Sequence, residues 1–166
     1  NPALGLPVGD GLMLLFRQDT GQLARVLLDE GHLTDERTAA AGALASKTLA
    51  PPDVRRIGIL GTGVQARLQA AHHARVFPNA ELLVWGRDAD KRAACAADLL
   101  DIGLLAAPAD DPELICGECT VIVTTTSATT PVLRSDWVQL GTHITAVGSD
   151  TPEKQELETD LLARAD

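Results

Sequence analysis

Hydrophobic and polar positions follow a short-strand pattern in the first third of the chain. Two apolar runs at 12–16 and 23–28 flank a turn signal, Asp-Thr-Gly, at 19–21, and together they predict a β-hairpin. Thr34 is a suitable N-cap, so the alanine-rich segment after it is expected to form a helix that ends near Ala50. Two prolines follow directly, and they end the helix because proline lacks the N–H and fixes φ.

Beyond the two prolines, apolar runs of strand length alternate with longer segments of helical periodicity. Strands are expected at about 56–60, 81–85, 102–106, 120–125 and 142–147, and helices at about 63–76, 88–100, 110–116 and 153–164. Strands separated by helices of this length join through right-handed crossovers into a parallel sheet that helices cover on both faces. The predicted fold class is therefore α/β, a Rossmann-type doubly wound parallel sheet, preceded by a hairpin and a helix.

The change of pattern at the prolines predicts two domains. Residues 1–50 hold the predicted hairpin and a linking helix. Residues 51–166 are expected to form the sheet domain. The chain starts at Asn1 rather than at Met, which favours a piece of a longer protein.

Composition narrows the classes of partner. Lys and Arg number 14 against 23 Asp and Glu, a formal charge of −9, which argues against nucleic acid and against an anionic membrane surface. Aromatic residues make up 2% of the chain, so stacking surfaces for bases are scarce. No apolar run reaches the roughly 18 residues of a membrane span. Three cysteines, an odd number, favour a reducing compartment, and we expect a cytoplasmic protein.

The strongest chemical motif is Gly-Thr-Gly-Val-Gln-Ala at 61–66, which follows an apolar strand and opens a helix. In a G-x-G-x-x-A turn the first glycine permits the tight turn and the second lets a pyrophosphate approach the backbone. The small last residue allows helix and strand to pack closely. Free N–H groups at the helix start bind the phosphates. The strand before the motif and the βαβ unit after it favour a dinucleotide site over a merely structural turn.

The choice of dinucleotide depends on the end of the next strand, about 20 residues beyond the glycines. Arg87 can pair with the 2′-phosphate of NADP(H). Asp88 can accept a hydrogen bond from the ribose 2′-hydroxyl of NAD(H), or it can cap the next helix. We expect NADP(H) to be favoured over NAD(H), because Arg87 places a cation where the phosphate would lie.

Three ordered segments carry a family resemblance: LTDERTAAA at 33–41, GTGVQAR at 61–67 and GTHITAVGSD at 141–150. They resemble the ornithine cyclodeaminase/mu-crystallin family, and the opening NPALGLP at 1–7 is similar to the branch that includes ectoine-utilisation cyclodeaminases. The resemblance covers essentially the whole chain. It implies that residues 51–166 are an NAD(P)-binding Rossmann domain, incomplete at its C-terminus, and that residues 1–50 are the end of a substrate-binding and dimerising domain with a linking helix. It also implies a small amino-acid or cyclic-imine substrate, and a homodimer in the full-length protein.

The resemblance also implies residues that contact the cofactor. Arg37 matches an arginine that lies against both cofactor and substrate carboxylate; the alternative is an exposed helix arginine paired with Asp35 or Glu30. The other expected cofactor contacts near the turn and the strand ends are Thr38, Gly61, Thr62, Gly63, Val64, Gln65, Thr124, Thr125, Thr126, Val147 and Gly148. The three threonines follow a strand beside the expected nicotinamide ribose, although threonine is also a common strand residue.

Asp150 matches the family's catalytic aspartate. It follows the last expected strand at the carboxyl edge of the sheet, where sites of α/β proteins lie, and it could move protons to and from a substrate amine. The alternative is a cap for a following helix. Lys154 matches a cofactor-contacting lysine, or else it pairs with Glu158 on the surface. Because mu-crystallin-like reductases lack this acid, Asp150 favours chemistry that eliminates or oxidises an amine.

The resemblance implies an NAD(P)-dependent, ornithine cyclodeaminase-like ammonia-lyase. Such an enzyme abstracts a hydride from an amino acid α-carbon, cyclises the product with loss of ammonia and returns the hydride, as from ornithine to proline. The alternatives are a reductase of cyclic imines such as pyrroline-2-carboxylate, an amino-acid dehydrogenase, and a non-catalytic binding protein of mu-crystallin type. The family's other substrate anchors would precede residue 1, so the isolated chain is expected to bind cofactor without turnover.

The remaining reactive side chains favour structural roles. Cys116 and Cys119 form a C-x-x-C without a second ligand pair, and His72 and His73 lack metalloprotease spacing. His143 lies in an expected strand and is more simply a structural histidine. No metal site is expected.

Overall fold

The computed structural model describes residue 5 and residues 10–165. The chain forms two compact units that divide between Thr38 and Ala39, inside helix α1 (His32–Leu49). The predicted domain boundary at residue 50 stays a prediction. Apart from Gly5, the opening segment 1–7 lies outside the described residues. Within the described part of the chain, no helix has the length and apolar character that crossing a membrane would require.

The first unit contains the predicted hairpin. Strand β1 (Leu12–Phe16) pairs antiparallel with β2 (Leu23–Leu28). In the turn, Gly21 N–H donates to Arg17 O at 2.9 Å, and Gly21 adopts φ +68°, a left-handed value that glycine tolerates. Every position of both strands is exposed, the apolar ones included. Because a two-stranded hairpin is only marginally stable in water, this apolar surface is suited to a partner surface.

Helix α1 starts at His32, so Thr34 is not its N-cap and that prediction is wrong. The Asp29 carboxylate, just ahead of the helix, instead accepts a hydrogen bond from Leu33 N–H in its first turn at 2.8 Å. The C-terminal end at Leu49, directly before the two prolines, confirms the predicted stop.

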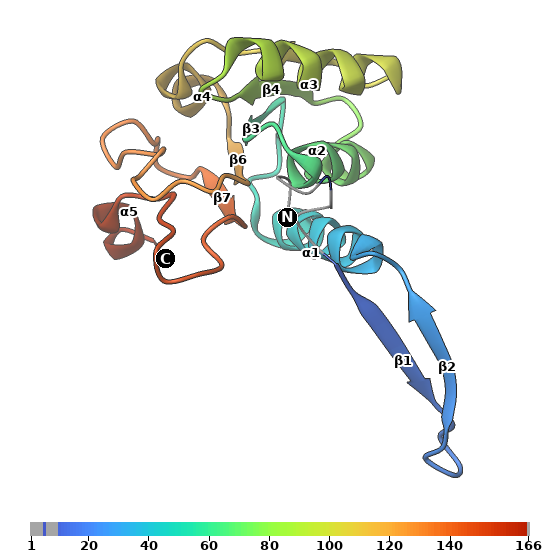
Figure 1. Cartoon of the computed structure of the whole chain (residues 1–166). Helices are drawn as coiled ribbons and strands as arrows, with labels where there is room; N and C mark the ends of the chain where they lie inside the picture. Colours follow the sequence, from blue (N-terminus) through green and yellow to red (C-terminus); the bar gives the residue numbers. More distant parts are fainter. Residues whose placement is uncertain (1–4, 6–9, 166) are drawn as a thin grey trace. The chain divides into compact units, whose positions relative to one another are not determined.

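The second unit contains a five-stranded sheet with the spatial order β5-β4-β3-β6-β7, and every pair in it is parallel. The strands are β3 (Arg56–Leu60), β4 (Glu81–Trp85), β5 (Ala106–Pro108), β6 (Val121–Thr124) and β7 (His143–Ala146). The helices that connect or follow them are α2 (Val64–Val76), α3 (Ala89–Asp101), α4 (Pro112–Glu118) and α5 (Thr159–Ala163) (Figure 1). The order reverses beside the central β3, as in a doubly wound fold, and the predicted fold class is confirmed.

Alternate residues of the strands face two separate cores. Ile57 and Ile59 of β3 point to the core that includes side chains of α2 and α3, whereas Leu60 points to the core that includes α4 and α5. Gly58 also faces α4, where a Cβ would collide with Ile115. Helices therefore cover both faces, and the continuous apolar strands predicted from the sequence are buried on both sides.

Two elements differ from the prediction. The expected strand at 102–106 is β5 at Ala106–Pro108, because α3 continues to Asp101 and Gly103 then turns the chain with φ +84°. The expected helix at 153–164 is reduced to α5, at Thr159–Ala163. Ahead of α5 the backbone is extended, and Leu157 forms a parallel bridge with Leu133. This extended segment contains Glu156, whose contacts are described with the site below.

A buried hydrogen-bonded histidine joins α1 and α2. His73 Nδ1 lies 2.7 Å from Gln69 O, and His73 Nε2 lies 2.9 Å from Ser46 Oγ. A carbonyl only accepts, so Nδ1 carries the proton, and in the neutral ring Nε2 accepts from the serine hydroxyl. Burial lowers the pKa of His73 below its ordinary value. The neutral form is therefore the one that the fold accommodates.

We expect the free energy of unfolding to fall as the pH decreases through about 6.5, the ordinary histidine value. Below it the unfolded chain gains a proton on His73, which the folded chain takes up only at lower pH. A His73→Gln variant should weaken this pH dependence by up to about 1.4 kcal/mol per pH unit. Urea unfolding at several pH values measures it, with the half-buried His72→Gln as control. An undiminished pH dependence in His73→Gln would contradict the assignment.

Candidate functional site

The turn after β3 lies at the point where the strand order reverses. Gly61 has φ +136°, and its N–H donates to Trp85 O at 2.8 Å. A Cβ at Gly61 would lie 3.0 Å from the Thr125 carbonyl oxygen and closer still to its hydroxyl. Glycine is therefore required here by the backbone angle and by the close approach of the segment after β6.

The N-terminus of α2 has no side-chain capping hydrogen bond at its N-cap. Its N-cap is Gly63, which has no side chain to accept from the first N–H groups, and the first turn carries no acid. Helices α3 and α4 differ, because Asp88 and Asp111 cap them. On the other side of the turn, Arg67 of α2 donates to Thr62 O at 2.5 Å. This hydrogen bond holds the turn in place. The backbone N–H groups at the start of α2 can donate hydrogen bonds to a phosphate, and the helix dipole favours its negative charge.

A cavity of about 360 Å³ lies along this edge. The turn after β3, the end of β4 and the segment after β6 form it. The predicted residues among those that line it are Gly61, Thr62, Gly63, Arg87, Asp88, Thr125 and Thr126. Trp85 and Lys91 line it as well, and neither was predicted. The size and the glycine-lined wall suit an extended phosphate-containing ligand.

At the end of β4 the two predicted residues have different environments. Asp88 is the N-cap of α3, and its Oδ1 accepts from Lys91 N–H at 3.1 Å. The structure therefore shows Asp88 in the helix-capping role that was the alternative to ribose binding. Arg87 is exposed on the cavity wall, and the Lys91 side chain adds a second cation. Lys91 could have been predicted from the sequence, because it is a basic residue in the first turn of the helix that follows β4.

The three threonines after β6 do not share one environment. Thr124 is fully buried and lies outside the cavity lining, and its hydroxyl donates to Glu156 at 2.7 Å. Thr125 and Thr126 line the cavity. The Thr125 hydroxyl donates to Leu60 O at 3.3 Å, and the Thr126 hydroxyl donates to Glu156 at 2.8 Å. Thr124 therefore has the structural contact, and Thr125 and Thr126 are the two that can face a ligand.

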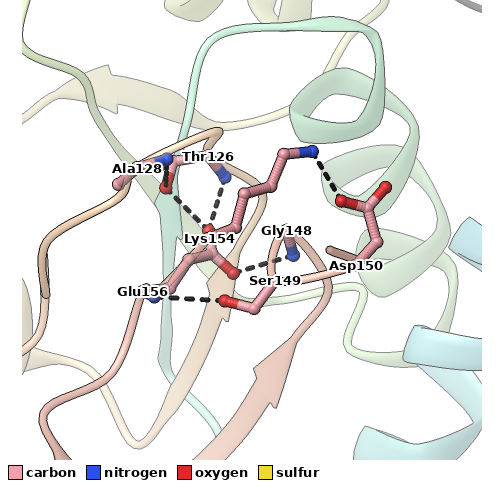
Figure 2. A network of polar contacts seen from close by, with 7 residues as sticks. All are labelled: Thr126, Ala128, Gly148, Ser149, Asp150, Lys154 and Glu156. Atoms are coloured by element: carbon pink, nitrogen blue, oxygen red, sulfur yellow. Dashed lines mark hydrogen bonds and ion pairs between the residues drawn. The ribbon is translucent and has the colours of Figure 1, made fainter. Parts of the chain in front are cut away.

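Glu156 is a fully buried acid that sequence reasoning missed. Figure 2 shows its carboxylate between the ends of two strands, with Thr126 on one side and Gly148 on the other. Gly148 N–H donates to it at 2.7 Å and Thr126 N–H at 2.5 Å. Gly148 fits this site because a Cβ there would collide with Thr126 O and with the carboxylate. The loop between Gly148 and Glu156 carries Asp150 and Lys154.

Asp150 is exposed on this loop, and Lys154 Nζ donates to its carboxylate at 2.5 Å (Figure 2). That hydrogen bond lowers the pKa of Asp150, so the group is a carboxylate at neutral pH. No helix starts here, since residues 151–153 form a turn, so the helix-cap alternative for Asp150 is wrong. Lys154 pairs with Asp150 rather than Glu158, which instead accepts from Ser135 N–H at 2.7 Å. Asp150 and Lys154 lie outside the lining of the cavity.

The other predicted residues lie around these groups. Val64 and Gln65 begin α2, and Val147 follows β7, where its N–H donates to Thr124 O at 2.9 Å. Arg37 and Thr38 belong to the first unit, on α1, where Arg37 is exposed. Their expected contacts with cofactor and substrate stay predictions.

The two cysteines of the C-x-x-C are buried and free. Burial raises the pKa of Cys116 to about 11 and that of Cys119 to about 12, so both are thiols at neutral pH. Across residues 10–165, no group of three or more His, Cys, Asp or Glu is arranged to hold a metal ion.

Comparison with known proteins places this chain in a family. The profile of the ornithine cyclodeaminase/mu-crystallin family matches residues 1–166. An archaeal alanine dehydrogenase dimer with bound NAD shares 36% identity at a TM-score of 0.90, over 99% of this chain and 51% of that one. Δ1-Pyrroline-2-carboxylate reductase of Thermococcus litoralis, in complex with NADH and L-proline, shares 29% identity at a TM-score of 0.89, over 99% and 51%.

A third structure is a lysine cyclodeaminase described with recognition of L-lysine, L-ornithine and L-2,4-diaminobutyric acid. It shares 39% identity at a TM-score of 0.88, over 99% of this chain and 48% of that one. The chain spans about half the length of the curated relatives it matches. With its doubly wound sheet, glycine turn and matched segments, the chain belongs to the ornithine cyclodeaminase/mu-crystallin family.

Proposed function

We propose that this chain binds a nicotinamide dinucleotide along the carboxyl edge of its sheet. The observation that carries the proposal is the tight Gly61 turn followed by Gly63, the N-cap of α2, which makes no side-chain capping hydrogen bond. The pyrophosphate would lie against these groups, and Thr125 and Thr126 would contact the nicotinamide ribose. Two of the similar structures hold NAD or NADH, which supports the assignment.

NADP(H) is the dinucleotide that the end of β4 favours. Arg87 and Lys91 both line the cavity there, and each can pair with a 2′-phosphate. Asp88 already accepts a hydrogen bond as the cap of α3, so less of its hydrogen-bonding capacity is left for a ribose hydroxyl. The two cations Arg87 and Lys91 therefore favour NADP(H) more strongly than Asp88, which already caps α3, favours NAD(H).

An Arg87→Gln variant is expected to bind NADPH about 10–100-fold more weakly, because a charge-assisted pair is worth roughly 1.5–3 kcal/mol. Its affinity for NADH should change little, since NADH lacks the 2′-phosphate. Arg55→Gln is the matched control, an exposed arginine before β3, at the opposite edge of the sheet. Titration with both dinucleotides measures the effect. Equal losses for NADPH and NADH would contradict the assignment of Arg87.

The chemistry that fits the site best in the full-length protein is cyclodeamination of a diamino acid. When bound, the oxidised nicotinamide accepts a hydride from the substrate α-carbon and later returns it. The Asp150 carboxylate would take a proton from the α-amino group and deliver one to the departing ammonia, and Lys154 would hold that carboxylate ionised. Arg37 would bind the substrate carboxylate. With ornithine, the products would be proline and ammonia.

The first unit would supply the rest of the enzyme. Its exposed apolar hairpin fits the end of a substrate-binding and dimerising domain, whose other half would come from the remainder of a longer chain. The full-length protein would then be a homodimer. The three cysteines are free, which favours the reducing cytoplasm.

Product analysis of the full-length protein separates the candidate reactions. With L-ornithine and a small amount of NAD(P)⁺, a cyclodeaminase releases one ammonia per ornithine without net reduction of the cofactor. Net reduction with an amino acid would instead identify an amino-acid dehydrogenase. Net oxidation of NAD(P)H with pyrroline-2-carboxylate would identify the cyclic-imine reductase. Dinucleotide binding without any of these reactions would identify a binding protein of mu-crystallin type.

A further inference from the structure

The Glu156 carboxylate is saturated with hydrogen bonds from neutral donors. One oxygen accepts from Thr126 N–H and the Thr126 hydroxyl, and the other accepts from Gly148 N–H and the Thr124 hydroxyl, all within 2.5–2.8 Å. The side chain is fully buried, and within the described part of the chain no cation pairs with it. A buried acid is costly unless such donors surround it, so four converging donors point to a specific role.

The main chain of Glu156 makes a second set of contacts. Its carbonyl accepts from Val132 N–H at 2.8 Å and from Leu133 N–H at 3.0 Å, and its own N–H donates to Ser149 Oγ at 3.1 Å. Val132 is part of the cavity wall. One residue thereby links the segment after β6, the end of β7 and the segment before α5.

These contacts fix two parts of the site that are separate in sequence. Through Thr126, Glu156 holds the cavity wall that would face the nicotinamide ribose. Through Gly148 N–H and Ser149 Oγ, it closes the base of the loop that carries Asp150 and Lys154. Figure 2 shows the Glu156 contacts with Gly148 and Ser149 beside the ion pair of Asp150 and Lys154.

We infer that Glu156 is a positioning residue, whose buried carboxylate couples the dinucleotide wall at Thr126 to the loop that carries Asp150. Glu156 touches neither ligand nor reacting atoms in this role; it acts through Thr126 and Gly148. The inference rests on the proposed dinucleotide site. A neutral amide in its place would present an N–H₂ group to two of the four donors, so one strand end would lose its partner.

Glu156→Gln and Thr124→Val test this inference, with Thr124→Ser and Val121→Ala as controls. Thr124 does not line the cavity, so its loss affects the site through Glu156, and serine restores the hydroxyl. Val121→Ala removes buried volume at the start of the same strand, away from the network. Each variant is titrated with NADPH at a temperature where circular dichroism shows it folded. Amide hydrogen exchange at Thr126 and Gly148 is followed without ligand.

We expect NADPH affinity to fall about tenfold or more in Glu156→Gln and by a smaller factor in Thr124→Val. The Thr126 and Gly148 amides should exchange faster in both. Thr124→Ser and Val121→Ala should bind as the wild type does. If Glu156→Gln fails to fold, the comparison of NADPH affinity and amide exchange between Thr124→Val and Thr124→Ser tests the inference by itself.

Two results would overturn the inference. One is wild-type affinity and wild-type exchange in the folded Glu156→Gln or Thr124→Val variant. The other is a loss of NADPH affinity in Val121→Ala as large as that in Glu156→Gln, which would show that the effect comes from general destabilisation of the fold. Failure of the wild-type chain itself to bind any nicotinamide dinucleotide is a different outcome, because it rejects the proposed site while the exchange data still report on the Glu156 contacts.

Discussion

An Asp150→Asn variant of the full-length protein is expected to turn over about 10²–10⁴-fold more slowly than the wild type, the usual contribution of a positioned acid or base. Asparagine keeps the shape and can still accept from Lys154, but it cannot take a proton from an amine. Dinucleotide affinity should change by no more than about twofold, because Asp150 lies outside the cavity lining. Steady-state kinetics together with a binding titration separate the two effects.

Asp53→Asn is the matched control for this variant. Asp53 is also an exposed carboxylate in an ion pair, with Arg55 at 3.1 Å, but it lies before β3 at the amino edge of the sheet. It should retain wild-type turnover. Full turnover in Asp150→Asn would contradict this prediction, because it would remove the aspartate from the chemistry.

A Gly61→Ala variant is expected to lose measurable dinucleotide binding. The methyl group would collide with Thr125, and alanine is disfavoured at φ +136°, so the turn must change shape. Strain of this kind costs roughly 1–3 kcal/mol, and the free energy of unfolding should fall by about that amount. Titration at a temperature where the variant stays folded measures the binding loss.

Gly117→Ala provides the comparison for this glycine. Gly117 lies within α4, and nothing lies within 4 Å of a Cβ built there. Alanine should therefore raise the free energy of unfolding by about 0.5–1 kcal/mol and leave binding unchanged. Wild-type dinucleotide affinity in Gly61→Ala would show that the turn does not approach the pyrophosphate.

The elements predicted well are those with strong local signals. β3 and β4 are continuous apolar runs, and the glycine turn between β3 and α2 has a sequence pattern tied to its backbone angles. β5 is only three residues long at the sheet edge and contains Pro108, so its position depends on where α3 ends and pairing with β4 begins. No periodicity within β5 itself marks that position.

The site residues that sequence reasoning missed are those defined by tertiary contacts. The segment around Glu156 is rich in charged residues and has the pattern of an exposed helix, yet its acid is buried because donors from Thr124, Thr126 and Gly148 converge on it. Acids are almost never fully buried unless paired, so nothing local indicates this position. Lys91 was missed because its side chain reaches the cavity only once α3 is placed beside β4.

The binding of a nicotinamide dinucleotide beside the Gly61 turn is tested most directly by the fluorescence of Trp85. The chain has two tryptophans, and a Trp137→Phe variant leaves Trp85, which lines the cavity, as the reporter. We predict saturable quenching of Trp85 by NADPH at micromolar concentrations, about tenfold below those needed for NADH. Quenching that does not saturate with either dinucleotide up to about 1 mM would contradict the proposed site.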